Sequence, residues 1–262
     1  MTEQQIRFDD GAAYERMMGT WSRFAGDIFL DWLAPAAGLR WVDVGCGNGA
    51  FTELIVGRCS PAEVEGIDPS EAQLSFARTR PAARLATFQQ GDAMALPFPD
   101  SSFEAAVMAL VIFFVPDPAK GVAEMMRVLK PGGTASAYAW DIPGGGLPME
   151  PLLVEMRAMG LATPRPPSFE VSRMEALRDL WTASGLESVE TKQIIVDRTF
   201  DSFEEFWTNS LLGPNVGQIV AGMTPDDAEL LKTRVRARLL ADSQGRVTCG
   251  ACANAVKGRK RG

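Results

Sequence analysis

Short apolar runs alternate with amphipathic segments along most of the chain beyond residue 40. The runs are rich in β-branched and aromatic side chains and are bounded by glycine, proline or charged residues, which is typical of buried strands. The segments between them place apolar residues three or four positions apart, which is the spacing of a helix that covers a sheet. This pattern predicts strands over residues 40–44, 63–67, 85–88, 103–110, 134–140, 186–197 and 245–256.

Helix boundary signals support the intervening helices. We expect one helix from about Ala50 to Arg58, and a second that opens at Ser70, whose hydroxyl suits an N-cap. A third should begin at Pro118, because proline fits the first turn, and should end before the helix-breaking sequence Lys-Pro-Gly-Gly over 130–133. Strands joined by helices form right-handed βαβ units. The chain is therefore predicted to be an α/β protein with a doubly wound, mostly parallel seven-stranded sheet and helices on both faces.

Three regions depart from this alternation. Residues 12–33 form an amphipathic helical pattern before the first strand. Residues 142–168 contain a helical segment bracketed by proline- and glycine-rich stretches, and residues 201–243 contain two or three helices. We expect one domain over residues 1–262, with residues 40–140 as its core and the three regions as additions to it.

The composition narrows the range of functions. The chain has 262 residues, of which 46% are hydrophobic and 23% are charged, which is typical of soluble globular proteins. Its 26 lysines and arginines against 33 aspartates and glutamates give a net charge of −7, which opposes binding to nucleic acid or to an anionic membrane surface. The chain has no histidine, so histidine-based nucleophile triads, histidine-ligated metals and imidazole general bases are excluded.

Neither a secretory signal nor a membrane span is expected. The amino terminus lacks a basic region followed by an apolar stretch, and the longest apolar run, residues 105–115, is about half the length that spans a bilayer. The scattered cysteines are typical of reduced thiols in a cytoplasmic protein. Cys249 and Cys252 have the spacing of a redox motif, but in a strand they point to opposite faces, so we expect no redox or metal site there. The basic residues 257–262 are expected to form a solvated terminus.

The most informative stretch is Val-Asp-Val-Gly-Cys-Gly-Asn-Gly-Ala-Phe over residues 42–51. A strand here runs into glycines, which allow a tight turn and close approach of the backbone to a ligand, and a helix begins directly afterwards. Gly45, Gly47 and Ala50 also satisfy the glycine pattern of dinucleotide-binding folds, with Asp68 placed to hold a ribose. On this stretch alone, a nicotinamide-dependent oxidoreductase stays open.

Further acids and motifs separate the alternatives. Asp43 lies two residues before Gly45, where a carboxylate suits a cationic ligand better than a pyrophosphate. A Gly-Asp-Ala sequence with Asp92 follows the third strand, Leu-Pro-Phe-Pro-Asp precedes the fourth, and Leu-Lys-Pro-Gly-Gly precedes the fifth. With these motifs, residues 40–140 strongly resemble the class I S-adenosylmethionine-dependent methyltransferases, specifically the type 11 group related to ubiquinone and menaquinone C-methyltransferases.

The resemblance implies a Rossmann-like fold, S-adenosylmethionine as the cofactor and a role for each matching residue. The glycine turn would approach the methionine part of the cofactor, with Asp43 near its ammonium group, and Asp68 would bind the ribose hydroxyls. Asp92 would accept a hydrogen bond from the adenine amino group. From the residues alone, Asp43 can instead be a buried acid satisfied by neighbouring amides, and Asp68 and Asp92 can be helix-cap or turn residues. The positions implied to bind the cofactor are Asp43, Gly45, Cys46, Gly47, Gly49, Asp68, Pro69, Asp92, Ala93 and Ala109.

No motif identifies the residues that would bind the acceptor of the methyl group. Many members of the family have histidines at the positions of Phe113 and Phe114, so no acid or base role carries over there, and no catalytic residue is identified. The helix over residues 12–33 is either a lid over the acceptor pocket or a helix packed on the sheet edge. The helical regions 142–168 and 201–243 are expected near the same pocket. The candidate substrate or lid residues are Tyr14, Trp21, Ser22 and Phe113.

The function that this resemblance implies is methyl transfer to a small-molecule acceptor by in-line displacement, driven mainly by positioning of the two reactants. A nicotinamide-dependent oxidoreductase and a non-catalytic cofactor-binding scaffold are the alternatives. We expect a small-molecule acceptor as the partner, no nucleic acid, no metal, no membrane span and a cytoplasmic location.

Overall fold

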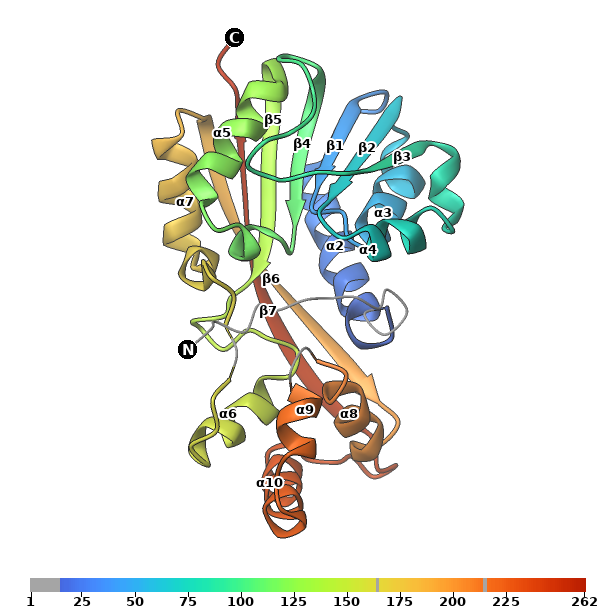
Figure 1. Ribbon diagram of the computed structural model, residues 1–262, viewed down its shortest axis with the longest axis vertical. Helices are drawn as coiled ribbons and strands as arrows, with labels where there is room; N and C mark the ends of the chain where they lie inside the picture. The colour runs from blue at the N-terminus through green and yellow to red at the C-terminus, as the bar shows by residue number, and fades with distance from the viewer. Residues whose placement is uncertain (1–14, 164, 214–215) are drawn as a thin grey trace.

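The computed structural model describes residues 15–163, 165–213 and 216–262. A seven-stranded sheet runs through it in the order β3-β2-β1-β4-β5-β7-β6, which confirms the predicted mostly parallel, doubly wound sheet (Figure 1). The strands are β1 (Arg40–Val44), β2 (Glu63–Asp68), β3 (Ala86–Gln90), β4 (Phe103–Ala109), β5 (Leu129–Trp140), β6 (Glu187–Phe200) and β7 (Val247–Arg259).

The sheet has a parallel part and an antiparallel edge. β1 pairs in parallel with both β2 and β4, and β3 and β5 extend the parallel part on either side. β7 lies antiparallel between β5 and β6. The order of strands reverses at the β1–β4 pair, and in sheets of this kind ligands bind beyond the carboxyl ends of the strands at that point.

Helices cover both faces of the sheet, with α2, α3 and α4 on one face and α5 and α7 on the other (Figure 1). The predicted helix starts are confirmed at α4, where the Ser70 hydroxyl accepts a hydrogen bond from the Gln73 amide, and at α5, which has Pro118 in its first turn. The helices are α2 (Thr20–Leu33), α3 (Ala50–Cys59), α4 (Glu71–Ala77), α5 (Pro118–Val128) and α7 (Met174–Ala183), with the π-helical turn η1 (Glu15–Gly19) and the 3₁₀ turns η2 (Pro81–Arg84), η3 (Ile112–Phe114) and η4 (Phe169–Ser172).

β6 and β7 form a long hairpin that continues beyond the rest of the sheet (Figure 1). Its far end carries a group of helices that we call the helical lobe: α6 (Glu150–Ala158), α8 (Phe203–Ser210), α9 (Val216–Ala221) and α10 (Pro225–Arg238). α6 comes from the region 142–168, and the other three come from the region 201–243. The carboxyl ends of the parallel strands point toward this lobe, so both additions lie on the ligand side of the sheet.

α2 packs on the sheet, which decides between the two positions considered for it. The ring of Phe29 lies 4.7 Å from the ring of Tyr138 in β5 and 5.9 Å from that of Phe51 in α3, measured between centroids. Trp21 and Ser22, two of the expected lid residues, are only 2% and 7% exposed. Residues 20–33 therefore form a core helix rather than a lid. Tyr14, the other candidate in this region, lies outside the described residues.

Two boundaries differ from the sequence prediction, both at the edge where β5 meets β7. β5 begins at Leu129, where the sequence predicts the end of a helix and a turn, because Leu129 pairs with Phe103 across an irregular register. The basic tail is not a solvated terminus, since β7 runs to Arg259 and the following backbone stays in the sheet. The Gly132 amide donates to the Lys260 carbonyl at 2.9 Å, and the Lys260 amide donates to the Gly133 carbonyl at 2.8 Å.

In the part of the chain that the structure describes, no helix combines the length and the apolar character that crossing a bilayer requires. The same residues contain no cluster of three or more cysteine and acidic side chains arranged to hold a metal ion. Cys249 and Cys252 are free thiols in β7, the first buried and the second half-buried, as their opposite orientation in a strand predicts.

Candidate functional site

The turn after β1 lies at the point where the order of the strands in the sheet reverses. Gly45, Gly47 and Gly49 have φ values of 77°, 52° and 78°, a region that other residues rarely adopt. A Cβ atom added to Gly45 would lie 2.4 Å from the side chain of Val111, so no larger residue fits there. A Cβ atom added to Gly47 would meet nothing within 4 Å. The turn is therefore closely packed at Gly45 and open at Gly47, where a ligand can approach the main chain.

Asp68 lies beside this opening at the end of β2. The Gly47 amide donates to its Oδ2 atom at 2.9 Å, and the Ser70 amide donates to its Oδ1 atom at 2.8 Å. Burial raises the pKa of Asp68, and the two amide hydrogen bonds oppose that increase. Each carboxylate oxygen can accept a second hydrogen bond, so the side chain is both oriented by the turn and able to receive a vicinal diol.

The loop after β3 lies next to the Asp68 loop, since the Gly91 amide donates to the Asp68 carbonyl at 3.2 Å. Asp92 is exposed in this loop, where its Oδ1 atom accepts a hydrogen bond from the Met94 amide at 2.8 Å. Pro69 is exposed and Ala93 is half-buried. These four positions, spread over two loops, therefore share one edge of the sheet, as a nucleoside-binding surface requires.

Asp43 lies below the glycine turn and has no exposed surface. The Thr52 hydroxyl donates to its Oδ2 atom at 2.7 Å, and its Oδ1 atom has no hydrogen-bond partner among the described residues. Burial raises the pKa of Asp43 to about 7, and the Thr52 hydrogen bond opposes that increase. An unpaired buried carboxylate oxygen fits the approach of a cationic group, and it equally fits a buried strand acid that keeps its proton.

The remaining expected positions border the turn in different ways. Cys46 is buried, and burial followed by the nearby Asp43 and Asp68 charges raises the pKa of its thiol, so it is not a nucleophile. Ala109 is the last residue of β4 and is half-buried, as expected for a backbone that borders the cofactor. Phe113 is 4% exposed and packs against Phe114 at 4.6 Å between ring centroids, so its position is that of a core residue.

Sequence reasoning missed a group of polar residues that joins η1 to the glycine turn, which we call the Arg80 clamp. The Arg80 guanidinium donates to the Asn48 carbonyl at 2.6 Å and to the Glu53 carboxylate at 2.9 Å, and it also pairs with Glu15. The Asn48 amide group donates to the same Glu15 carboxylate at 3.0 Å. Glu15 and Arg80 are 65 positions apart, and no local pattern links them. The clamp holds the start of the described chain against the turn.

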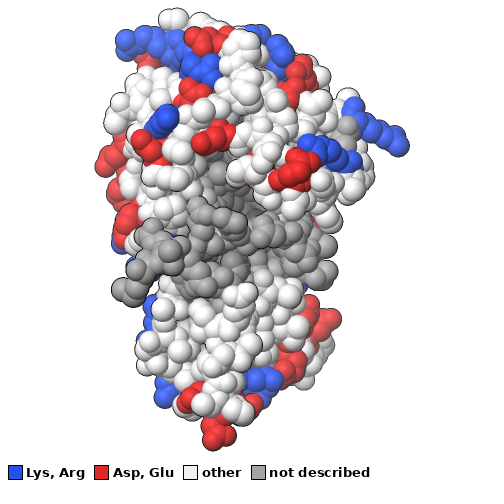
Figure 2. Space-filling view, viewed as in Figure 1, with Lys and Arg blue, Asp and Glu red and all other residues white. Residues whose placement is uncertain are grey.

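A small apolar hollow of about 10 Å³ lies beyond the clamp, where η1 and α2 meet α8. It is lined mainly by methionine and aromatic side chains, among them Met17, Trp21 and Phe206. Trp21 is thus the one expected lid residue that borders a hollow in the described part of the chain. On the face shown in Figure 2, charged side chains are scattered over the upper half and occur again at the lower tip, and most of the surface just above that tip is uncharged.

The chemistry available to this arrangement is binding and orientation rather than acid–base catalysis. No histidine occurs in the sequence, and the acids at the turn are engaged by backbone amides or by Thr52. Such a site can hold two reactants in line and exclude water, which by itself accounts for about 7–11 kcal/mol of a barrier.

Comparisons with known proteins agree with this geometry. A family model described as a methyltransferase domain matches residues 42–137. The chain is 42% identical over 121 residues to 2-methyl-6-phytyl-1,4-hydroquinone methyltransferase 2, chloroplastic, from Oryza sativa subsp. japonica, which covers 45% of this chain and 34% of that protein. It is 35% identical over 136 residues to the ubiquinone/menaquinone biosynthesis C-methyltransferase UbiE of Dinoroseobacter shibae, which covers 50% of this chain and 54% of that protein.

A solved structure extends the likeness in fold to nearly the whole chain. The YcgJ protein of Bacillus subtilis superimposes with a TM-score of 0.61 at 19% identity, over 92% of this chain and 99% of that one. The sequence relatives, by contrast, match this chain over about a third to a half of their own lengths. Residues 42–137 therefore match a methyltransferase domain, in agreement with the resemblance of the chain's motifs to the type 11 group of class I S-adenosylmethionine-dependent methyltransferases.

Proposed function

We propose that this chain transfers the methyl group of S-adenosylmethionine to a small-molecule acceptor. The observation that carries the proposal is the open backbone at Gly47 directly beside the oriented carboxylate of Asp68. Asp92 adds a second acid on the neighbouring loop, and Asp43 adds an unpaired buried oxygen below the turn. The cofactor-binding residues in this proposal are Asp43, Gly45, Cys46, Gly47, Gly49, Asp68, Pro69, Asp92, Ala93 and Ala109.

Each part of the site has a distinct task in this reaction. Bound S-adenosylmethionine supplies a methyl group on a positively charged sulfur, which is readily displaced. The glycine turn receives the amino-acid end, and the Asp43 carboxyl below it balances the ammonium charge. Asp68 holds the ribose hydroxyls, and Asp92 with its loop faces the adenine. Because no imidazole is available, the chain contributes orientation and a water-poor site, and the acceptor provides the nucleophile.

The acceptor side and the domain plan form the second part of the proposal. We place the acceptor between the carboxyl ends of the strands and the helical lobe, so that residues 1–262 act as one cytoplasmic methyltransferase domain in which the regions 142–168 and 201–243 shape the pocket. The two sequence relatives are named as a methyltransferase of a phytyl hydroquinone and as a C-methyltransferase of ubiquinone and menaquinone biosynthesis. A small cyclic acceptor with apolar surface agrees with the methionine and aromatic side chains near η1.

The test compares two glycines of the same geometry. Gly38 has a φ of 78° and, like Gly47, has nothing within 4 Å of an added Cβ, but it lies before β1 at the opposite edge of the sheet. Gly47→Val and Gly38→Val should each lower the free energy of unfolding by about 1–2 kcal/mol, because both place a side chain at positive φ. Only Gly47→Val should abolish binding of S-adenosylmethionine in calorimetry, because only its side chain fills the approach to the turn.

Titration with NADH completes this test. Above pH 7, wild-type protein should bind S-adenosylmethionine and S-adenosylhomocysteine and should show no heat with NADH, since Asp43 is then ionised and repels a pyrophosphate. Normal S-adenosylmethionine affinity in Gly47→Val would remove the turn from the site. Tight NADH binding by the wild-type protein would replace the proposal with an oxidoreductase.

A further inference from the structure

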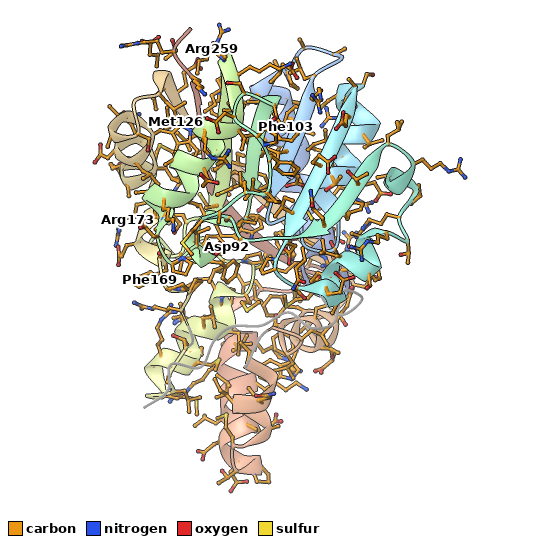
Figure 3. The ribbon with its side chains drawn as sticks, turned by 45° about the horizontal axis from the view of Figure 1, so that its top comes forward. Asp92, Phe103, Met126, Phe169, Arg173 and Arg259 are labelled. Carbon is orange, nitrogen blue, oxygen red and sulfur yellow. The ribbon has the colours of Figure 1, made fainter. Side chains whose placement is uncertain are left out.

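A second cavity lies apart from the glycine turn, after the end of β5. Its volume is about 460 Å³, within the range of about 300–1,000 Å³ that is usual for small-molecule sites. The loop over residues 142–147, one side of α6 and the segment around η4 enclose it. Figure 3 shows Phe169 and Arg173 together at this side of the molecule, and no residue of the loops after β2 and β3 lines the cavity. The cavity is therefore distinct from the nucleoside-binding surface formed by the loops after β2 and β3.

The charges around this cavity favour an anion. Arg157 pairs with Glu150, and Arg173 pairs with Glu170 at 2.8 Å. Arg165 also lines the cavity but has no carboxylate partner among the described residues. The charges of these lining side chains sum to a single positive charge, in a protein whose net charge is −7. A local excess of positive charge in an acidic protein is the arrangement that attracts an acidic ligand.

The Arg165 side chain is also oriented for this task. Its guanidinium lies over the ring of Phe169, 4.8 Å from the ring centroid. Stacking on an aromatic face restricts the side chain but leaves the N–H groups at the edge of the guanidinium free to donate. A planar guanidinium of this kind matches a carboxylate or a phosphate through two parallel hydrogen bonds.

Part of the cavity lining is apolar. Leu153 is buried, and Ile142 and Leu147 are half-buried where they border the cavity. The Ile142 amide donates to the Ser172 hydroxyl at 3.2 Å, which joins the loop after β5 to η4. A ligand in this cavity therefore meets a charged side at Arg165 and an apolar side at Leu153, which suits an acid with a hydrocarbon or aromatic body.

The cavity shares structural support with the glycine turn. The Ser168 amide donates to the Phe113 carbonyl at 3.1 Å, and the Ser168 hydroxyl donates to the Val115 carbonyl at 2.8 Å. These contacts attach the segment that carries Arg165 and Phe169 to the loop after β4. The same loop contains Val111, whose side chain packs against Gly45. A ligand in the cavity therefore contacts a segment that is anchored to the loop beside the cofactor turn.

We propose that this cavity binds a small organic acid, with its carboxylate or phosphate group on the Arg165 guanidinium and its apolar body against Ile142 and Leu153. This binding site is separate from the proposed cofactor site, because none of its residues belongs to the glycine turn or to the loops of Asp68 and Asp92.

The experiment measures binding of benzoate and phenyl phosphate to the full chain, with benzamide as an uncharged probe of the same shape. In ligand-detected NMR, both acids should bind and benzamide should bind at least about tenfold more weakly, because it lacks the charge that Arg165 recognises. Arg165→Gln should weaken both acids by about tenfold or more. Arg84→Gln is the matched control, since Arg84 is exposed, carries the same charge and lies in η2, outside the cavity.

A second variant tests the site by a gain instead of a loss. Glu170→Gln removes the carboxylate that pairs with Arg173, so it should strengthen benzoate binding several-fold. Equal affinity for benzoate and benzamide, or equal losses in Arg165→Gln and Arg84→Gln, would overturn the proposal. Gly47→Val separates the two functions, because it should abolish S-adenosylmethionine binding and leave benzoate binding unchanged. If benzoate binding disappeared together with S-adenosylmethionine binding in that variant, the cavity would not be an independent site.

Discussion

Asp43 is completely buried, and one of its two carboxylate oxygens has no hydrogen-bond partner among the described residues. Whether this carboxyl group is ionised in the folded protein therefore depends on the pH. Among the described residues only the Thr52 hydroxyl donates to it, while burial raises its pKa from 3.8 to about 7. Below pH 3.8 the group is protonated in both the folded and the unfolded chain. Between that value and about 7, the unfolded chain has released the proton and the folded chain still holds it. The folded state binds more protons in this window, so its stability falls as the pH rises.

We therefore predict a pH-dependent difference between the wild-type protein and Asp43→Asn, whose amide has nearly the same shape and does not titrate. The free energy of unfolding of the wild type should fall relative to the variant by about 4 kcal/mol as the pH rises from about 4 to about 7, and the difference should then stay constant. Urea denaturation of both proteins across this range measures it, and subtraction removes the titration of all other groups. A difference that is independent of pH would mean that Asp43 is ionised throughout.

The residues of the candidate site differ in how far the sequence alone could predict them. Gly45, Gly47 and Asp68 were predictable because each lies at the end of a strand, and parallel strands place those ends at one edge of the sheet. Trp21 and Phe113 were not, because an apolar residue on a helical pattern can face a ligand or the core equally well. Trp21 packs against Phe200, and the Phe113 carbonyl accepts a hydrogen bond from the Ser168 amide, and both partners are distant in the sequence.

Among the secondary-structure elements, η1 depends on a contact that no local pattern predicts. η1 is a π-helical turn, which is rare because its backbone is less favourable than that of an α-helix. Such turns often occur at functional sites. The contacts of the Arg80 clamp that hold this turn come from Asn48 in the glycine turn and from Arg80, which directly precedes η2. With only 10% of its side chain exposed, Arg80 makes these contacts out of competition with water.

We predict that Arg80→Met loosens both η1 and the glycine turn. Hydrogen exchange should accelerate over residues 15–19 and 45–49, and the affinity for S-adenosylmethionine should fall by about 1–2 kcal/mol, because the Asn48 carbonyl loses a charged donor. Arg58→Met is the matched control: Arg58 pairs with Asp27 and Asp31 and joins α2 to α3 away from the turn. Equal acceleration in both variants would show that the clamp has no specific effect on the turn.

The helices whose starts the sequence predicted correctly are fixed by residues close to them in the chain. Ser70 caps α4 and Pro118 opens α5 through contacts within a few residues. The carboxyl-terminal tail was misplaced because its determinants are remote. Gly258 lies in β7 where an added Cβ would come within 3.1 Å of Trp181, so its lack of a side chain lets α7 pack closely on the sheet. A polar, basic sequence gives no sign of such a contact.

The molecule as a whole consists of a seven-stranded sheet and a helical lobe that is assembled from two separate segments of the chain. α6 precedes β6 in the chain, whereas α8, α9 and α10 connect β6 to β7, so the lobe forms only when these segments meet. Glu155 of α6 provides one such link. It pairs with Arg238 at the end of α10 and lies 3.9 Å from Arg234, and only 10% of its side chain is exposed.

We predict that Glu155→Gln destabilises the helical lobe without changing the cofactor site. Loss of the charge leaves Arg234 and Arg238 without their common acid partner, and the free energy of unfolding should fall by about 1–3 kcal/mol in urea denaturation. The matched control is Glu204→Gln in α8, which also removes an acid that pairs with two cations of α10, Lys232 and Arg236. Glu204 is 56% exposed, so solvent screens its pairs and the loss should be much smaller.

Hydrogen exchange locates the effect of Glu155→Gln within the molecule. Faster exchange should be confined to α6 and α10, because these two helices share the lost ion pairs, while the sheet keeps its protection. Affinity for S-adenosylmethionine should stay within about twofold of the wild type, since the glycine turn and the loops of Asp68 and Asp92 belong to the sheet and not to the lobe. If Glu155→Gln weakened cofactor binding as strongly as Arg80→Met, the lobe and the sheet would have to be treated as one cooperative unit at the site.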